Sequence, residues 1–333
     1  MKRLLIVSVV AAVIGAMSPV VAVAAAPEPT VREIEASTIL GDDHYGSIRI
    51  VADNVTLDCD GHSVLGPGAE ESPGGDRLGG IHVEADGVTV QNCFVSGYEG
   101  GGIAVFGAGS WLKNNTVSDS GGGFGVNFSN GNLFENNHSI NNEVDGFLIR
   151  FSENNRFLGN TAVGGIVGFS IEGGPDHVLD GNSTSVNGVG FEVAEATGNT
   201  IENNVAAGGD VGFSLSDSDN NTVEGNYMDH LAVGISLFFS SENNVEGNTV
   251  FRSTETGFSL YEANDNVLEG NRSQKNLGDG FAVSGSSGNV FEDNAAVANG
   301  GYGFFDDQPL ENTYSDNRCG GNQSGASDPE GLC

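Results

Sequence analysis

Three charged residues in the middle of the chain have the types and the spacing needed for chemistry on one surface. Arg150, Glu172 and Glu192 follow one another at intervals of 22 and 20 residues. If the chain returns to the same face about every 22 residues, adjacent strands place these side chains about 5–10 Å apart. Two carboxylates at such a distance can act as acid and base on the glycosidic bond of a neutral glycan. The alternative is a cross-strand ion pair that serves only the fold.

The element that would position these residues is a repeat of about 22 residues. A glycine followed by an apolar, a variable and another apolar residue forms a column at Gly80, Gly102, Gly125, Gly146, Gly168, Gly190, Gly212, Gly234, Gly257, Gly280 and Gly303. An asparagine column runs in phase with it at Asn115, Asn137, Asn160, Asn182, Asn204, Asn226, Asn248, Asn271, Asn294 and Asn317. Two columns that hold register over so many repeats indicate a solenoid.

Each repeat is too short for a pair of helices, and it alternates apolar and polar residues as a strand does. After Gly212, for example, Phe213 and Leu215 are apolar and separated by a serine. Phenylalanine follows the column glycine in most repeats, and we expect Phe169, Phe191 and Phe213 to stack on one another inside the coils. The fold that satisfies this pattern is a parallel β-helix.

The asparagine column has a structural explanation in that fold. Asparagine adopts the left-handed conformation that a sharp bend requires, and stacked amides about 4.8 Å apart can form a hydrogen-bonded ladder. An acidic column stands two residues before the ladder at Asp180, Glu202, Glu224, Glu246, Glu269 and Glu292. Because stacked like charges repel, this column is either a solvated face suited to salty surroundings or a cation-binding stripe.

Strand alternation also predicts which residues face solvent. The second and fourth residues after each column glycine point outward. The candidate substrate-binding residues at such positions are His82, Glu84, Phe238 and Tyr261. In the coil of Gly125, the same rule places Asn127 and Ser129 outside. An insertion at 66–79 borders this face, and loops that leave a regular scaffold often carry function.

The segment 52–64, ADNVTLDCDGHSV, resembles the opening coil of NosD-like proteins and of other right-handed β-helix repeat proteins of the pectate-lyase-like superfamily. The resemblance extends over residues 46–317. It implies an all-β fold, a single-stranded right-handed parallel β-helix (a solenoid) of about twelve coils of 22–23 residues. Because that superfamily includes lyases, epimerases, hydrolases and non-catalytic proteins, the resemblance does not select a function.

The resemblance also implies roles for the charged cluster. By similarity to uronate lyases and epimerases of the superfamily, Arg150 would be the base that takes the proton next to a uronate carboxyl. Glu172 and Glu192 would hold a calcium ion that neutralises that carboxylate. We expect no other cofactor. A copper site, which the family name suggests, has little support because the six histidines do not fall at ligand spacing.

The charge of the chain and its first residues limit its partners and its location. Twelve basic and 45 acidic residues give a formal net charge of −33, which excludes binding to nucleic acid or an anionic membrane through a basic face. Residues 1–24 combine Lys2, Arg3 and an apolar run before small residues, as a secretory signal peptide does. No later apolar run is long enough to span a bilayer. We therefore expect a secreted or periplasmic protein.

Four cysteines fit an oxidising compartment and allow three pairings. We expect the pairs Cys59–Cys93 and Cys319–Cys333, because this pairing constrains each end of the chain with its own disulfide.

The domain organisation follows from the repeat. We expect a β-helix over 46–317, an N-terminal cap over 25–45 and a C-terminal cap over 318–333, because uncapped ends would template aggregation.

Two classes of function remain open. The first is an extracellular enzyme, a calcium-assisted polysaccharide lyase or epimerase. The second is a non-catalytic NosD-like periplasmic or surface platform. In both cases the partner is a polysaccharide or a cell-surface glycan. The net charge counts against a naked polyuronate, which would be repelled unless calcium bridges it.

Overall fold

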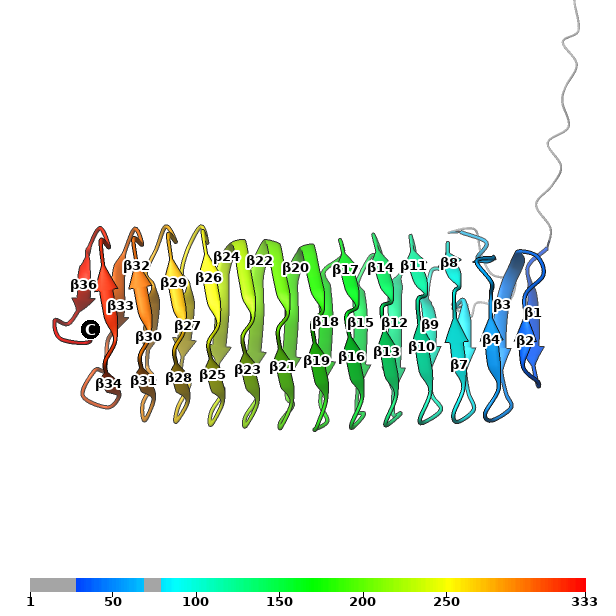
Figure 1. Cartoon of the computed structure of the whole chain (residues 1–333), viewed down its shortest axis with the longest axis horizontal. Coiled ribbons are helices and arrows are strands. Elements are labelled where there is room, and N and C mark those ends of the chain that lie inside the picture. Colours follow the sequence, from blue (N-terminus) through cyan, green and yellow to red (C-terminus); the bar gives the residue numbers. More distant parts are fainter. Residues whose placement is uncertain (1–27, 69–78) are drawn as a thin grey trace, which may run out of the picture.

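The computed structural model describes residues 28–68 and 79–333, which form an elongated right-handed parallel β-helix (Figure 1). The coils stack in chain order from β1 (Thr30–Ile34) at one end to β36 (Gly325–Asp328) at the other. One sheet has 13 strands and the other has 23, which corresponds to about 13 turns. The expected fold is confirmed.

Each turn visits three faces in the same order. The 13-stranded sheet contains β2 (Thr38–Ile39), β4 (Thr56–Asp58), β7 (Thr89–Gln91), β10 (Trp111–Lys113), β13 (Leu133–Glu135), β16 (Arg156–Leu158), β19 (Val178–Asp180), β21 (Thr200–Glu202), β23 (Thr222–Glu224), β25 (Asn244–Glu246), β28 (Val267–Glu269), β31 (Val290–Glu292) and β34 (Thr313–Ser315). The next face contains β5 (Ser63–Leu65), β8 (Phe94–Ser96), β11 (Thr116–Ser118), β14 (His138–Ile140), β17 (Thr161–Val163), β26 (Thr249–Phe251), β29 (Arg272–Gln274), β32 (Ala295–Val297) and β35 (Arg318–Gly320). The face led by the column glycines contains β1, β6 (Ile81–Val83), β9 (Gly101–Val105), β12 (Gly122–Asn127), β15 (Asp145–Arg150), β18 (Val167–Glu172), β27 (Phe258–Tyr261), β30 (Phe281–Ser284), β33 (Tyr302–Asp306) and β36. Four longer strands cover both of the last two faces: β3 (His44–Ile50), β20 (Ser183–Ala194), β22 (Val205–Ser216) and β24 (Tyr227–Phe238).

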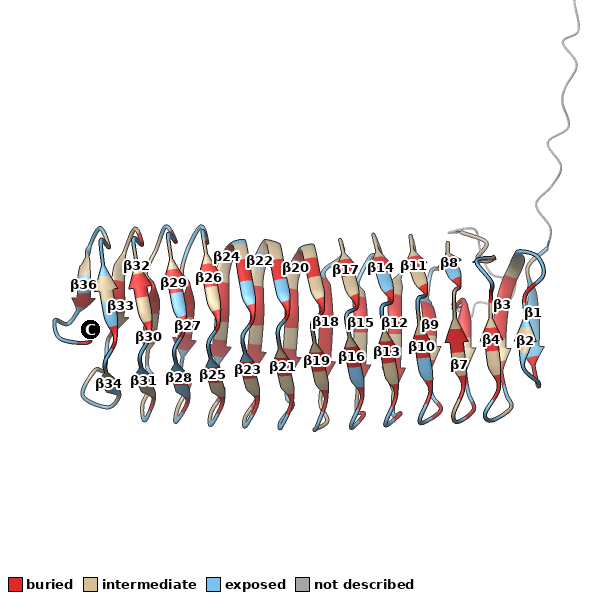
Figure 2. Cartoon of the chain, viewed as in Figure 1, coloured by how far each residue is buried: buried red, intermediate tan, exposed pale blue. Residues whose placement is uncertain are grey.

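The interior is a stack of aromatic rings, as expected. Phe169 and Phe191 stack with ring centroids 5.1 Å apart, and Phe191 and Phe213 stack at 4.6 Å. The buried residues line the inside of every coil (Figure 2). Outward residues alternate with them along each strand, so the surface chemistry is read directly from the register.

The asparagine ladder is present at one corner of the coil. Asn204 accepts hydrogen bonds from the backbone N–H and the side-chain amide of Asn182, at 2.8 and 3.0 Å, and its own amide donates to Asn226. A second ladder, which we did not expect, follows another corner through Asn199, Asn221, Asn243, Asn266 and Asn289.

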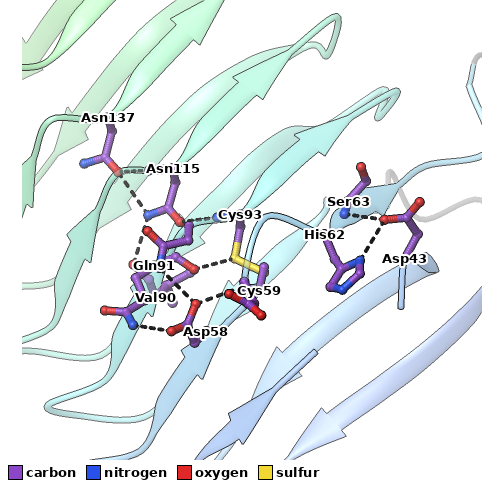
Figure 3. The surroundings of a disulfide bond; sticks show 12 residues. Asp43, Asp58, Cys59, His62, Ser63, Val90, Gln91, Cys93, Asn115 and Asn137 are labelled. Carbon is purple, nitrogen blue, oxygen red and sulfur yellow. Dashed lines mark hydrogen bonds and ion pairs between the residues drawn. A yellow bond between two sulfur atoms is a disulfide. The ribbon is translucent and has the colours of Figure 1, made fainter. Parts of the chain in front are cut away.

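Both expected disulfides are present. The Cα atoms of Cys59 and Cys93 are 4.8 Å apart, and those of Cys319 and Cys333 are 5.8 Å apart. Figure 3 shows that the first disulfide continues the ladder column, because the backbone N–H of Cys93 donates to the side-chain oxygen of Asn115. The bond therefore replaces the ladder in the first two coils.

The structure extends the glycine-led face at both ends. Strand β1 pairs with β3 ahead of the first expected coil, and β36 pairs with β33 after the last. The signal-peptide prediction over 1–24 lies outside the described residues, as does most of the insertion at 66–79. No helix able to cross a membrane occurs within 28–68 and 79–333.

Candidate functional site

The coil that contains Gly125 is shifted by two residues from our expectation. Phe124 pairs with Phe147 and stacks on its ring at 4.7 Å, so Gly123 is the glycine of the column. The expectation was wrong because both Gly123 and Gly125 are followed by an apolar, a variable and an apolar residue. As a result Gly125 points outward, whereas Ser129, expected outside, is buried.

This shift leaves a patch with no side chain larger than a methyl group on the glycine-led face, which we call the groove floor: Gly101, Ala104, Gly122 and Gly125. A Cβ atom added to any of the three glycines would meet no atom closer than 3.5 Å, and none of them has a positive φ. A Cβ atom on the column residue Gly123 would instead lie 2.2 Å from a carbonyl oxygen. The fold therefore requires glycine in the column but not in the floor.

Larger side chains stand on both sides of the groove floor. Asp145, Leu148 and Arg150 of β15 line one side of a cleft of about 260 Å³ above the floor, which we call the groove. On the other side, strand β6 contributes His82, whose ring centroid is 6.3 Å from that of Phe106. The cleft itself is lined by a carboxyl and a guanidinium, and the imidazole of His82 lies next to Ala104 on the neighbouring strand.

Asp145 is the most perturbed acid of the groove. Burial, reinforced by the nearby carboxylates of Glu172 and Glu192, raises the pKa of Asp145 from 3.8 to about 6, although Arg150 opposes this shift. A carboxyl group with such a pKa exchanges protons near neutral pH, which is the property that general acid–base catalysis needs.

Arg150 and Glu172 form the ion pair that we considered as an alternative. The guanidinium donates from Nε to Oε2 and from Nη2 to Oε1, the second bond at 2.9 Å. The hydrogen bond to Glu172 raises the pKa of Arg150 further. A guanidinium held in this way keeps its proton, so the geometry favours Asp145 over Arg150 for proton transfer.

Glu84 is held in an ion pair with Arg49, and His82 is perturbed by burial. Arg49 donates to both carboxylate oxygens of Glu84, at 2.9 and 2.7 Å, and contacts Glu33 at 3.0 Å. Burial lowers the pKa of His82, in spite of the nearby Glu84. The imidazole is therefore neutral at pH 7 and can both donate and accept a hydrogen bond to a ligand.

The remaining candidates lie farther along the β-helix. Glu192 follows on the strand next to Ser170, with their side-chain oxygens 3.4 Å apart. Phe238 and Tyr261 stack at 5.4 Å, but they lie at least four coils beyond Arg150, about 19 Å at the parallel-strand spacing. The structure brings Arg150 and Glu172 together and places the aromatic pair outside the groove.

Sequence reasoning missed Asp145, although a signal was present. Asp145 stands directly before the column glycine Gly146. The residue at the same position in the next four coils is Val167, Val189, Val211 or Val233. An acid in a column of valines marks a local departure from the repeat.

The residues present do not fit a copper centre. Within 28–68 and 79–333, no group of three or more His, Cys, Asp or Glu side chains converges as metal ligands would. His177 is buried in the second ladder, where its Nδ1 accepts a hydrogen bond from the backbone of Asn155, and burial lowers its pKa to about 4. A calcium ion on Glu172 would have to displace Arg150.

The fold and the groove together define a β-helix protein with a polar surface site. The sequence model of the family described as periplasmic copper-binding protein (NosD) matches residues 53–206 and 166–330. The chain belongs to the NosD family. No curated protein matches it. The disulfides and the periplasmic description of the family are consistent with an exported protein.

Several solved structures of similar fold are proteins that act on polysaccharides. The periplasmic alginate epimerase AlgG has 17% sequence identity and a TM-score of 0.60, with 76% of this chain and 74% of that chain covered. The A-module of the mannuronan C-5 epimerase AlgE4 of Azotobacter vinelandii has 15% identity and a TM-score of 0.69, with 85% and 88% covered. The catalytic domain of a GH87 alpha-1,3-glucanase variant in complex with nigerose has 12% identity and a TM-score of 0.55, with 90% and 63% covered. At these identities the likeness establishes the fold.

Proposed function

We propose that this protein binds a polysaccharide in the groove and that Asp145 transfers protons to it. The observation that supports the proposal is the groove floor, where three glycines have no role in packing or backbone conformation. A floor with no side chain larger than a methyl group lets a flat sugar ring approach the sheet. Phe106 offers an apolar ring face, and His82 and Asp145 offer hydrogen-bonding groups beside it.

The geometry supports a neutral glycan best. Glu172 takes up the guanidinium of Arg150, so the groove offers no unpaired positive charge among the described residues to a uronate. The net charge of −33 also repels polyanions. Protonated Asp145 can donate to a glycosidic oxygen, and a neighbouring carboxylate such as Glu192 can accept a proton from water, which is the division of roles in glycoside hydrolysis.

A second candidate is a calcium-assisted uronate lyase or epimerase, which the two epimerase structures of similar fold favour. In that reaction, ionised Asp145 would take the proton next to the uronate carboxyl, and Arg150 would face the carboxylate. Glu172 and Glu192 would have to hold calcium after Glu172 releases Arg150.

One experiment separates these functions from a non-catalytic platform. The mature protein is incubated with dextran, xylan, galactomannan, alginate and pectate, with and without calcium, and both binding and product release are measured. We expect binding and slow cleavage of a neutral glycan without calcium. Calcium-dependent turnover of alginate or pectate would support the second candidate. Binding without turnover would support a non-catalytic binding platform. No binding to any glycan would contradict the proposal.

The Gly125→Leu variant tests the location of the site. A leucine at this position fills the groove without meeting backbone, because a Cβ atom there contacts only the side chain of Asn127 at 3.5 Å. We expect the affinity for the best-binding glycan to fall at least about tenfold, the effect of 1.4 kcal/mol. Ala282→Leu is the matched control, because Ala282 holds the equivalent outward position on β30. Equal loss of affinity in both variants would place the site elsewhere.

A further inference from the structure

We propose a second sugar-binding subsite at the corner of the coil that follows the groove, where Phe128 and Phe151 form a platform on which pyranose rings stack. The inference rests on the proposed function and extends it, because it identifies the ligand as a neutral oligosaccharide long enough to occupy two adjacent sites. We call the pair the Phe128–Phe151 platform.

Packing does not explain the two rings. Phe128 is 76% exposed and Phe151 is 59% exposed, and the rings stack on each other with centroids 5.4 Å apart. Phenylalanines that stack on each other and still remain this exposed offer a flat apolar surface to solvent, which is a feature of interaction sites.

Backbone geometry does not explain them either. Phe128 and Phe151 have φ angles of 51° and 47°, in the left-handed region that bulky residues adopt only at an energetic cost. The same corner position holds Gly173, Glu195, Asp217 and Phe239 in the next four coils, so the fold sets the left-handed backbone at this corner and leaves the residue type open. Strained side chains persist where their function requires them. The two phenylalanines therefore point to a ligand rather than to the fold.

A hollow lies directly beside the platform. Phe151, Glu172, Gly173, Ala194 and Glu195 line a cleft of about 250 Å³. A Cβ atom on Gly173 would lie 3.3 Å from the ring of Phe151, so the absence of a side chain there keeps one ring face open while Phe128 covers the other. The open face and the two carboxylates match a sugar ring, whose C–H face stacks on the phenyl group and whose hydroxyls donate to Glu172 and Glu195.

The hollow and the groove are neighbours. Arg150 lines the groove, Phe151 follows it in the chain, and Glu172 lines the hollow and pairs with Arg150. The ion pair thus stands between the two sites. One glycan can occupy both by crossing this pair, and the acidic lining of the hollow selects a neutral sugar over a uronate.

The test uses Phe151→Asn and Phe128→Asn in the mature protein, with binding of the best-binding neutral polysaccharide and of a disaccharide fragment of it as readouts. Asparagine accepts the left-handed conformation, so both variants should fold with an unchanged or higher melting temperature. We expect the affinity for the polysaccharide to fall at least tenfold in Phe151→Asn and by less in Phe128→Asn, which removes only the ring behind Phe151, with a smaller loss for the fragment in both. Val186→Asn is the matched control, because Val186 has a φ of 58° and is exposed at a different corner. We expect its affinity to match that of the wild-type protein.

The other results overturn the inference in distinguishable ways. Full affinity in both phenylalanine variants, together with lost affinity in Gly125→Leu, would exclude the second subsite and retain the groove as the binding site. A lower melting temperature in Phe151→Asn, with affinity unchanged, would assign the ring to packing. A stronger loss for alginate than for neutral glycans would reject the ligand class. No binding of any glycan to the wild-type protein would overturn both the subsite and the proposed function.

Discussion

The Asn204→Ala variant should lose about 3–5 kcal/mol of unfolding free energy, because it breaks the ladder in the middle of the β-helix. Asn204 is fully buried. Its side-chain oxygen accepts the backbone N–H of Asn182 at 2.8 Å, and its amide donates to the carbonyl of Leu179 at 2.8 Å. Alanine can replace neither bond, and no water reaches the vacated positions easily. The buried N–H of Asn182 would therefore lose its acceptor.

Urea denaturation measures this loss, and Glu202→Gln provides the control. Glu202 lies two residues earlier on the outer surface of the same coil, between Asp180 and Glu224, so its neutralisation relieves like-charge repulsion and leaves stability unchanged or slightly higher. We expect the denaturation midpoint of Asn204→Ala to fall well below that of Glu202→Gln. Equal midpoints would show that the ladder contributes nothing to the stability of the coil.

The Asp145→Asn variant should lose turnover and gain stability at the same time. If Asp145 transfers the proton, asparagine lowers kcat by about a hundredfold or more. In the folded protein, burial first and the nearby carboxylates second raise the pKa of this acid from 3.8 to about 6. A raised pKa means that the folded state holds the proton more tightly than the unfolded state. Ionised Asp145 therefore destabilises the fold.

The sign of the pH dependence follows from this shift. The loss of folding stability caused by ionised Asp145 is absent below pH 3.8, grows as pH rises, and is fully present above about pH 6. One pKa unit corresponds to about 1.4 kcal/mol. The free energy of unfolding of Asp145→Asn should therefore exceed that of the wild-type protein by about 2–3 kcal/mol at about pH 8 and by little at about pH 4. Denaturation midpoints at the two pH values provide the measurement. A variant that is less stable at both values, or one that keeps full turnover, would contradict the role of Asp145.

The repeat made the fold predictable. Inward residues such as Phe191 and Asn204 contact the equivalent residues of the coils above and below. Their residue types therefore recur at a constant spacing. The second ladder is harder to recognise from the sequence because His177 interrupts its column of asparagines. The extra turn at the N-terminal end lacks the column glycine, so β1 carries no sign of the repeat.

The groove was harder to predict because it depends on residues that lack side chains. Gly123 and Gly125 satisfy the same sequence pattern, and only the stacking of Phe124 on Phe147 decides between them. The ion pair of Arg150 and Glu172 follows from the register, whereas the raised pKa of Asp145 depends on its burial, which a repeat does not specify. Outward residues vary freely from coil to coil, so periodicity says little about their partners.

A crystal structure of the protein with a bound oligosaccharide would show whether a glycan binds over the groove floor. The crystals would be soaked with a fragment of the best-binding neutral glycan. We expect a sugar ring above Gly122 and Gly125, between Phe106 and Asp145, with the next sugar against Phe151. An oligosaccharide bound to the 13-stranded sheet, or at either end of the β-helix with the groove empty, would contradict it.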